Sequence, residues 1–150
     1  MLWRRKKLDE DMCITAVVAF NVYIKRLEKG LSLVITPSDV VQFALDRYGI
    51  EIPEDLARET LEKLVEMNIM KRAENGYTMS DIVAQAFALA HAVAEDVKNP
   101  SLLELAQRGA SIATTLLASH NPREVMATMK KLREVSECGA KAIERLAKSV

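Results

Sequence analysis

The 150-residue sequence has few of the residues that interrupt or cross-link a chain: five glycines, four prolines and two cysteines. It has two isolated histidines, and aromatic residues make up only 5%. Without clustered cysteines or histidines, the chain lacks the pattern of a structural zinc site or a disulfide framework. The 21 basic residues balance the 21 acidic ones, so whole-chain charge indicates neither nucleic-acid nor membrane binding.

Long hydrophobic runs are also missing, since the apolar stretches 13–24 and 82–94 are too short to span a bilayer. Residues 1–7 are basic and precede the first of these stretches, as in a secretory signal. An acidic cluster at 9–11 interrupts that pattern, and no small-residue cleavage site follows. We therefore expect a cytoplasmic protein, in which Cys13 and Cys138 are partly buried, reduced thiols. Scarce glutamine and short loops are weak signs of a thermophilic source.

Hydrophobic residues make up 49% and charged residues 28%, which predicts one folded domain or two small modules with a shared core. The stretch 9–29 begins with acids, ends with three cations and is followed by Gly30, the order expected for a helix. Its middle is apolar nearly all round. Such a helix is usually covered on two sides, by other elements or at a subunit interface.

The next 50 residues alternate helix signals with short strand signals. Residues 31–36 are of strand type, and Thr36-Pro37-Ser38-Asp39 predicts a capped helix start. A further helix is predicted over 54–67, with Asn68 as its left-handed terminator. Asn-Gly within 74–76 predicts a β-hairpin.

From Ser80 onward the pattern is helical, and the predicted segments run from Ser80 to about Lys98, from Ser101 to Ser119, and from Pro122 to the end. In the last segment apolar residues recur at spacings of four and three, with a weak middle at Ser136 and Gly139. The predicted fold class is mainly α with one small β-hairpin.

The order helix, short strand, helix, helix, hairpin over 31–79, preceded by the helix 9–29, resembles the winged helix-turn-helix superfamily. The stretch LARETLEKLVEMNIMKRAENGYTM is similar to that superfamily's third helix, cap and wing. Asn68 stands where the superfamily usually has glycine. The resemblance implies a winged-helix domain at 9–79 and a helical packing or dimerisation segment at 80–150.

Most winged helices bind DNA with the third helix in the major groove and the wing along the backbone. Carried over to this chain, the resemblance implies contacts at the second helix start, on the third helix and on the wing. The basic N-terminal tail is a further candidate. These residues are Thr36, Ser38, Arg58, Lys63, Lys71, Arg72, Arg4, Arg5, Lys6 and Lys7.

The charge of the third helix argues against that reading. Between Gly49 and Glu66 there are six acids and two cations, a net charge of −4. An acidic helix is repelled by phosphates, and each phosphate contact normally requires a cation.

Two functions follow from these observations. The first is a winged-helix DNA-binding protein, a dimeric transcriptional regulator that dimerises through 80–150. The alternative is a protein–protein interaction module in a larger cellular assembly, without direct DNA binding. We expect no enzyme, cofactor or metal site, since the sequence has no Gly-rich phosphate loop and no nucleophile–His–acid pattern.

Overall fold

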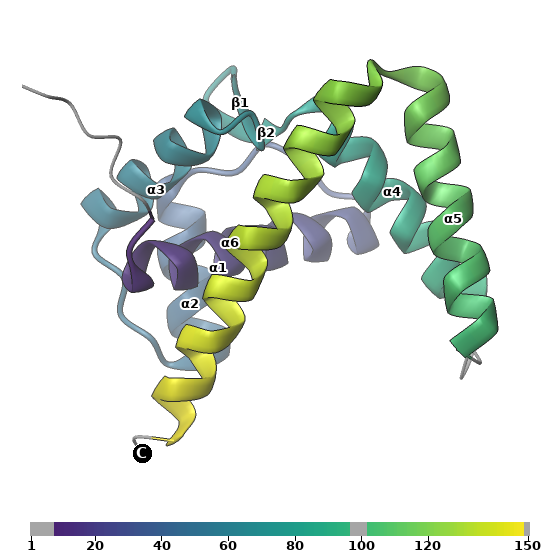
Figure 1. Ribbon diagram of the computed structural model, residues 1–150. Helices are drawn as coiled ribbons and strands as arrows, with labels where there is room; N and C mark the ends of the chain where they lie inside the picture. Colours follow the sequence, from purple (N-terminus) through teal and green to yellow (C-terminus); the bar gives the residue numbers. More distant parts are fainter. Residues whose placement is uncertain (1–7, 97–101, 149–150) are drawn as a thin grey trace, which may run out of the picture.

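A computed structural model describes residues 8–96 and 102–148 of the chain (Figure 1). The predicted class, mainly helical with a small antiparallel hairpin, is confirmed. None of the helices in the described ranges is both long and apolar enough to cross a membrane. The elements are α1 (Glu10–Lys29), α2 (Pro37–Tyr48), α3 (Glu54–Glu66), β1 (Met70–Ala73), β2 (Gly76–Met79), α4 (Asp81–Asp96), α5 (Leu102–Ser119) and α6 (Pro122–Lys148).

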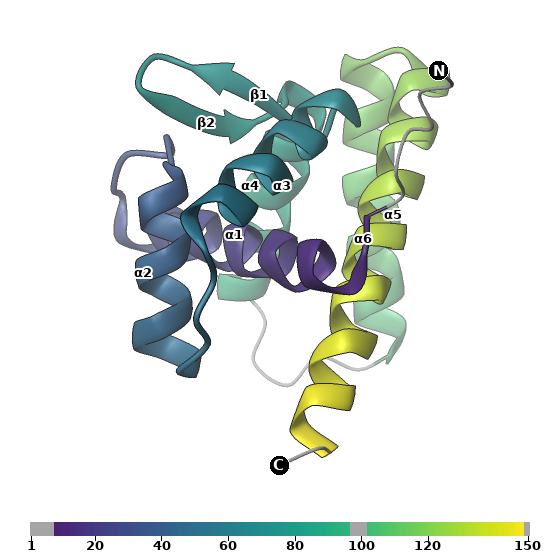
Figure 2. The ribbon, with the colours of Figure 1, turned by 90° about the vertical axis from the view of Figure 1, so that its left-hand side faces the viewer.

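Helix α1 lies at the centre of the molecule, and α2, α3, α4 and α6 all contact it (Figures 1 and 2). Asp9 caps its start by accepting a hydrogen bond from the Met12 amide at 2.9 Å, and Gly30 ends it with φ of 67°. The expectation that this helix is covered on two sides is confirmed. Its buried residues are Cys13, Thr15, Ala16, Val18, Ala19, Phe20, Val22 and Tyr23.

The ends of α2 and α3 follow their local sequence. Thr36 and Asp39 form the predicted capping box, in which each side chain accepts a hydrogen bond from the other residue's amide. Asn68 adopts φ of 61°, the left-handed conformation predicted for it, and the chain turns there from α3 into β1. Short polar side chains tolerate this conformation better than most residues.

The strand predicted at 31–36 is reduced to a single β-bridge between Ile35 and Tyr77. The Arg26 guanidinium explains part of this difference, since it donates to the Ser32 carbonyl at 3.1 Å and to the Val34 carbonyl at 3.4 Å. These bonds occupy carbonyls that a longer strand ladder would have used.

The hairpin forms as predicted, but its turn is one residue earlier than the Asn-Gly pair suggests. Glu74 and Asn75 make the turn, Asn75 has φ of 65°, and Gly76 already pairs with Ala73 in the ladder. A Cβ atom on Gly76 would lie 2.5 Å from the Ile35 carbonyl oxygen. Glycine is therefore required at 76 by the close approach of the neighbouring segment.

The three C-terminal helices have nearly the predicted bounds, and Lys98 and Ser101 lie outside the described residues. Asn121 caps α6, since its side chain accepts from the Arg123 amide at 2.9 Å. Ser80 differs from its predicted capping role. Its buried hydroxyl has no hydrogen-bond partner among the described residues, and its carbonyl alone accepts from the Ala84 amide.

Helix α6 crosses α1 and shares its core, so residues from both predicted segments pack together (Figure 1). The buried seam of α6 alternates three and four residues, as in a heptad, and it keeps the predicted Val125, Leu132 and Gly139, while its alternate positions lie one residue earlier than predicted. Thr128 and Val135 are buried in place of Met129 and Ser136. Gly139 is a point of close approach, because a Cβ atom there would overlap a Val17 methyl group and lie 2.8 Å from the Cys13 carbonyl oxygen.

Cys13 of α1 and Cys138 of α6 are joined in a disulfide, with their Cα atoms 5.7 Å apart. The expectation of two reduced thiols is therefore wrong. It relied on the distance between the two residues along the chain, which carries no information on how two helices cross.

The glycines of α6 and α5 provide a matched test of this helix crossing. Gly139→Ala should lower the free energy of unfolding by about 1 to 3 kcal/mol, since the added methyl overlaps α1. Gly109→Ala, with no neighbouring atom within 4 Å, should raise it by up to about 1 kcal/mol through helix propensity. Chemical denaturation of both variants is the measurement. Equal effects would show that α6 does not pack closely on α1 in solution.

Candidate functional site on the third helix

Helix α3 has one buried face and one acidic face. Its buried residues, Ala57, Thr60, Leu61 and Leu64, pack on the core at helical spacing. Four acids spaced by four, three and four residues lie on a different side of the helix, where the periodicity brings them onto one face. This acidic face consists of Asp55, Glu59, Glu62 and Glu66.

The acidic face borders a shallow groove between α3 and the first turn of α1. Met12 supplies an apolar side chain from α1, and Arg58 and Lys63 are the cations among its lining residues. With four carboxylates against two cations, the lining carries a net charge of −2. The groove is therefore suited to a cationic ligand more than to a phosphate backbone.

Glu62 links α3 to the hairpin. Its carboxylate accepts from the Arg72 guanidinium, with Nε to Oε2 at 3.2 Å, and also from the Tyr77 hydroxyl. The bond from Arg72, followed by that from Tyr77, lowers the pKa of Glu62. Burial first, and then the bond to Glu62, raises the pKa of Tyr77. The hairpin is therefore attached to the acidic face by its own cation.

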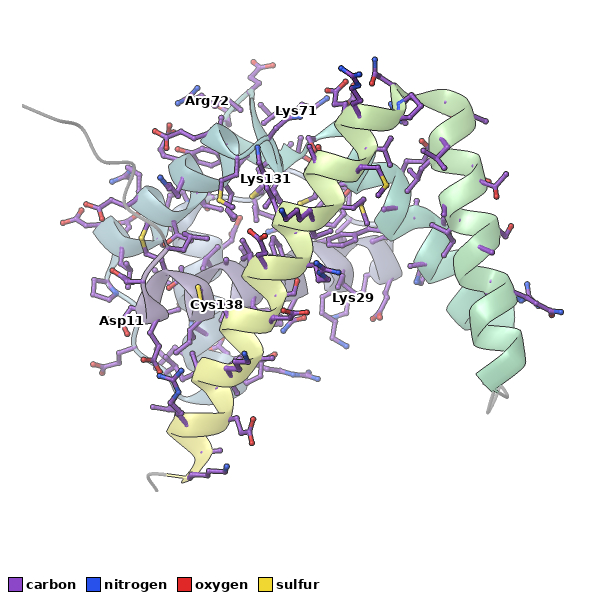
Figure 3. The ribbon with its side chains drawn as sticks, in the orientation of Figure 1. Asp11, Lys29, Lys71, Arg72, Lys131 and Cys138 are labelled. Atoms are coloured by element: carbon purple, nitrogen blue, oxygen red, sulfur yellow. A yellow bond between two sulfur atoms is a disulfide. The ribbon has the colours of Figure 1, made fainter. Side chains whose placement is uncertain are left out.

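The other predicted wing cation is also paired. Lys71 donates to Asp81 at the start of α4 at 2.7 Å, and this bond lowers the pKa of Asp81. Figure 3 shows Lys71 and Arg72 on opposite sides of the hairpin. On α3, Lys63 is 3.4 Å from Glu66. Sequence analysis did not identify Glu62 and Asp81 as the partners of Arg72 and Lys71, because each acid lies ten residues along the chain from its cation and on a different element.

The remaining predicted contact residues differ in whether their side chains already have partners within the chain. Thr36 accepts from the Asp39 amide, and Ser38 donates to Glu54 Oε1 at 3.0 Å. Arg58 is exposed, and the described part of the chain provides no ion pair for it. The four predicted tail contacts, Arg4, Arg5, Lys6 and Lys7, lie outside the described residues.

No group of three or more His, Cys, Asp and Glu side chains in the described ranges is arranged to hold a metal ion. The carboxylates of the α3 groove can accept hydrogen bonds from ammonium or guanidinium groups, and such bonds are strong because both partners are charged.

The link between Glu62 and the hairpin predicts a specific pH dependence. A carboxyl with a lowered pKa stabilises the fold fully above its ordinary pKa of about 4.5, and this stabilisation is lost as the pH falls through the lowered value. Glu62→Gln should therefore lower Tm at neutral pH by less than about 4 °C. The difference from wild type should shrink as the solution is acidified. Glu59→Gln, on the same face, is the control, and a pH-independent difference for Glu62→Gln would contradict the assignment.

Comparison with known family models, curated proteins and solved structures found no match for this chain. The superfamily resemblance therefore remains a prediction from residues 31–79. The function of this site therefore has to be inferred from the charges of the α3 groove and from the ion pairs between the hairpin cations and acids of this chain.

Proposed function

We propose that the protein is an interaction module of winged-helix type, whose α3 groove binds a basic segment of a partner protein. One observation supports this above all. The exposed face of the helix that would read DNA carries four carboxylates, while both cations of the adjacent hairpin are already paired with acids of this chain.

The alternative, a dimeric DNA-binding regulator, requires cations that are free to meet phosphates. Arg58 meets that requirement, but Lys63, Lys71 and Arg72 would each have to leave a carboxylate first. The carboxylates released in this way would then face the phosphate backbone and repel it. The same surface attracts a basic peptide without any of these losses.

The groove also indicates the composition of its partner. Asp55 and Glu59 have no hydrogen-bond or ion-pair partner among the residues the structure describes, so they are available to cations. Met12 offers an apolar contact beside them. A segment with two or more Lys or Arg residues and one apolar side chain matches this lining. Its binding should be salt-dependent, because exposed charges are screened.

Two further parts of the expected function remain proposals. Because α6 packs on α1, a homodimer through 80–150 would have to use α4, α5 or the outer face of α6, where Leu117 and Met126 are 42% and 67% exposed. A cytoplasmic location is compatible with the Cys13–Cys138 disulfide chiefly in a hyperthermophilic source, since most cytosolic proteins keep their thiols reduced.

The test compares two ligands by fluorescence anisotropy over a range of salt concentrations. The first is a labelled synthetic peptide of alternating arginine and leucine, and the second is a mixed-sequence DNA duplex. We expect the peptide to bind and the duplex to bind much more weakly at equal salt. Asp55→Asn with Glu59→Gln should weaken peptide binding by about tenfold, as expected for the loss of two charge-assisted contacts.

Glu124→Gln with Glu134→Gln is the matched control, since it removes two exposed acids of α6 and leaves the groove intact. It should leave peptide affinity nearly unchanged. Equal loss in both double variants would mean that the peptide responds to overall charge and not to the groove. Tight, steeply salt-dependent duplex binding would overturn the proposal in favour of the DNA-binding regulator.

A further inference from the structure

We propose that Cys138 is a site of thiol–disulfide exchange with low-molecular-weight thiols, and that reduction there releases residues 139–148 of α6 from α1. This inference concerns the opposite end of α1 from its Gly30 cap and does not depend on the function proposed for α3.

The two cysteines of the disulfide differ in exposure. Cys13 is only 1% exposed, within the core-facing side of α1. Cys138 is half-buried and lines an open groove between the start of α1 and α6 (Figure 3). We infer from this difference in residue exposure that a thiolate attacks at Cys138 in preference to Cys13. Access to one sulfur decides which mixed disulfide forms.

One cation of the groove is placed to attract an approaching thiolate, although the lining as a whole is slightly acidic. Lys141 and Arg145 follow Cys138 by three and seven residues, which places all three on one face of α6 and in the groove. Arg145 is paired with Glu10 at 3.2 Å, whereas Lys141 has no ion pair among the described residues. Three glutamates also line the groove and leave it with a net charge of −1, so attraction of a thiolate to Cys138 depends on Lys141. Cations beside a sulfur stabilise thiolates.

The exchange is a balanced two-step reaction. The sulfur of an attacking thiolate forms a bond to the Cys138 sulfur, and the bond between the Cys138 and Cys13 sulfurs breaks. Cys13 leaves as a thiolate and takes up the proton that the attacking thiol gave to solvent. A second thiol then attacks the mixed disulfide and releases Cys138, so two thiols become one small disulfide.

The consequence follows from how little apolar surface the end of α6 buries. Before Cys138, the helix contributes Val125, Leu132 and Val135 to the core. After it, the buried residues are Gly139 and Ala142, which are small, while Ile143 and Leu146 are 39% and 44% exposed.

Burial of small side chains stabilises little, and an exposed ion pair such as Arg145–Glu10 contributes little more. The disulfide is thus the principal attachment of residues 139–148. Segments attached so weakly open locally without global unfolding.

The experiment uses the full chain and glutathione as the probe. Peptide mapping by mass spectrometry after quenching should find the mixed disulfide on Cys138. Hydrogen exchange of the fully reduced protein should be at least about tenfold faster over 139–148 than in the oxidised protein, as expected for local opening. Exchange in α3 should change little.

Two variants complete the test. Cys138→Ser should show the fast exchange over 139–148 in the absence of any thiol, with circular dichroism confirming that the rest of the chain is folded. Lys141→Gln should slow the first exchange step by about two- to fivefold, as expected for the loss of one nearby charge. Three results would each overturn the proposal: glutathione attached to Cys13, unchanged exchange over 139–148 after reduction, or reduction no faster than global unfolding.

Discussion

The burial of α1 is the constraint on which the rest of the structure depends. This helix has apolar residues nearly all round, and such a helix cannot be stable with one side in water. Four other helices contact it, and the buried residues of both predicted segments therefore belong to one core. The crossing of α6 over α1 is the way this chain covers the second side of that helix.

Close backbone approach decides the details of this packing at two glycines. At Gly139, the absence of a side chain lets α6 come near enough to α1 for Cys13 and Cys138 to lie within disulfide distance. At Gly76, it lets the segment before α2 pair with the hairpin through Ile35. From the sequence, Gly139 is interpreted as a weak position in the heptad seam of the last helix, and Gly76 as part of the hairpin turn. Their actual role is steric, and it depends on elements that are distant in sequence.

Ion pairing around the acidic face of α3 decides which charged side chains are available to a partner. Counted along the chain, Lys71 and Arg72 are wing cations suited to phosphates. In the structure they are bound to Asp81 and Glu62, and Tyr77 joins the second pair. Glu62, one of the acids that argued against DNA from the sequence, therefore also occupies Arg72, a cation that argued for it. The partner that we propose is therefore a cationic one, because Asp55 and Glu59 have no ion pair among the described residues of the groove.

The sequence alone determined the local structure. Caps at Asp9, Thr36 and Gly30, the left-handed Asn68 and the hairpin all follow from interactions within a few residues, where side-chain chemistry acts directly on the backbone. The acidic character of α3 could be predicted in the same way. Only the tertiary structure decided the shortened strand at 31–36, the disulfide, the seam of α6 and the partners of the hairpin cations. These depend on which elements meet in space, and such contacts leave no periodic or local pattern in a single sequence.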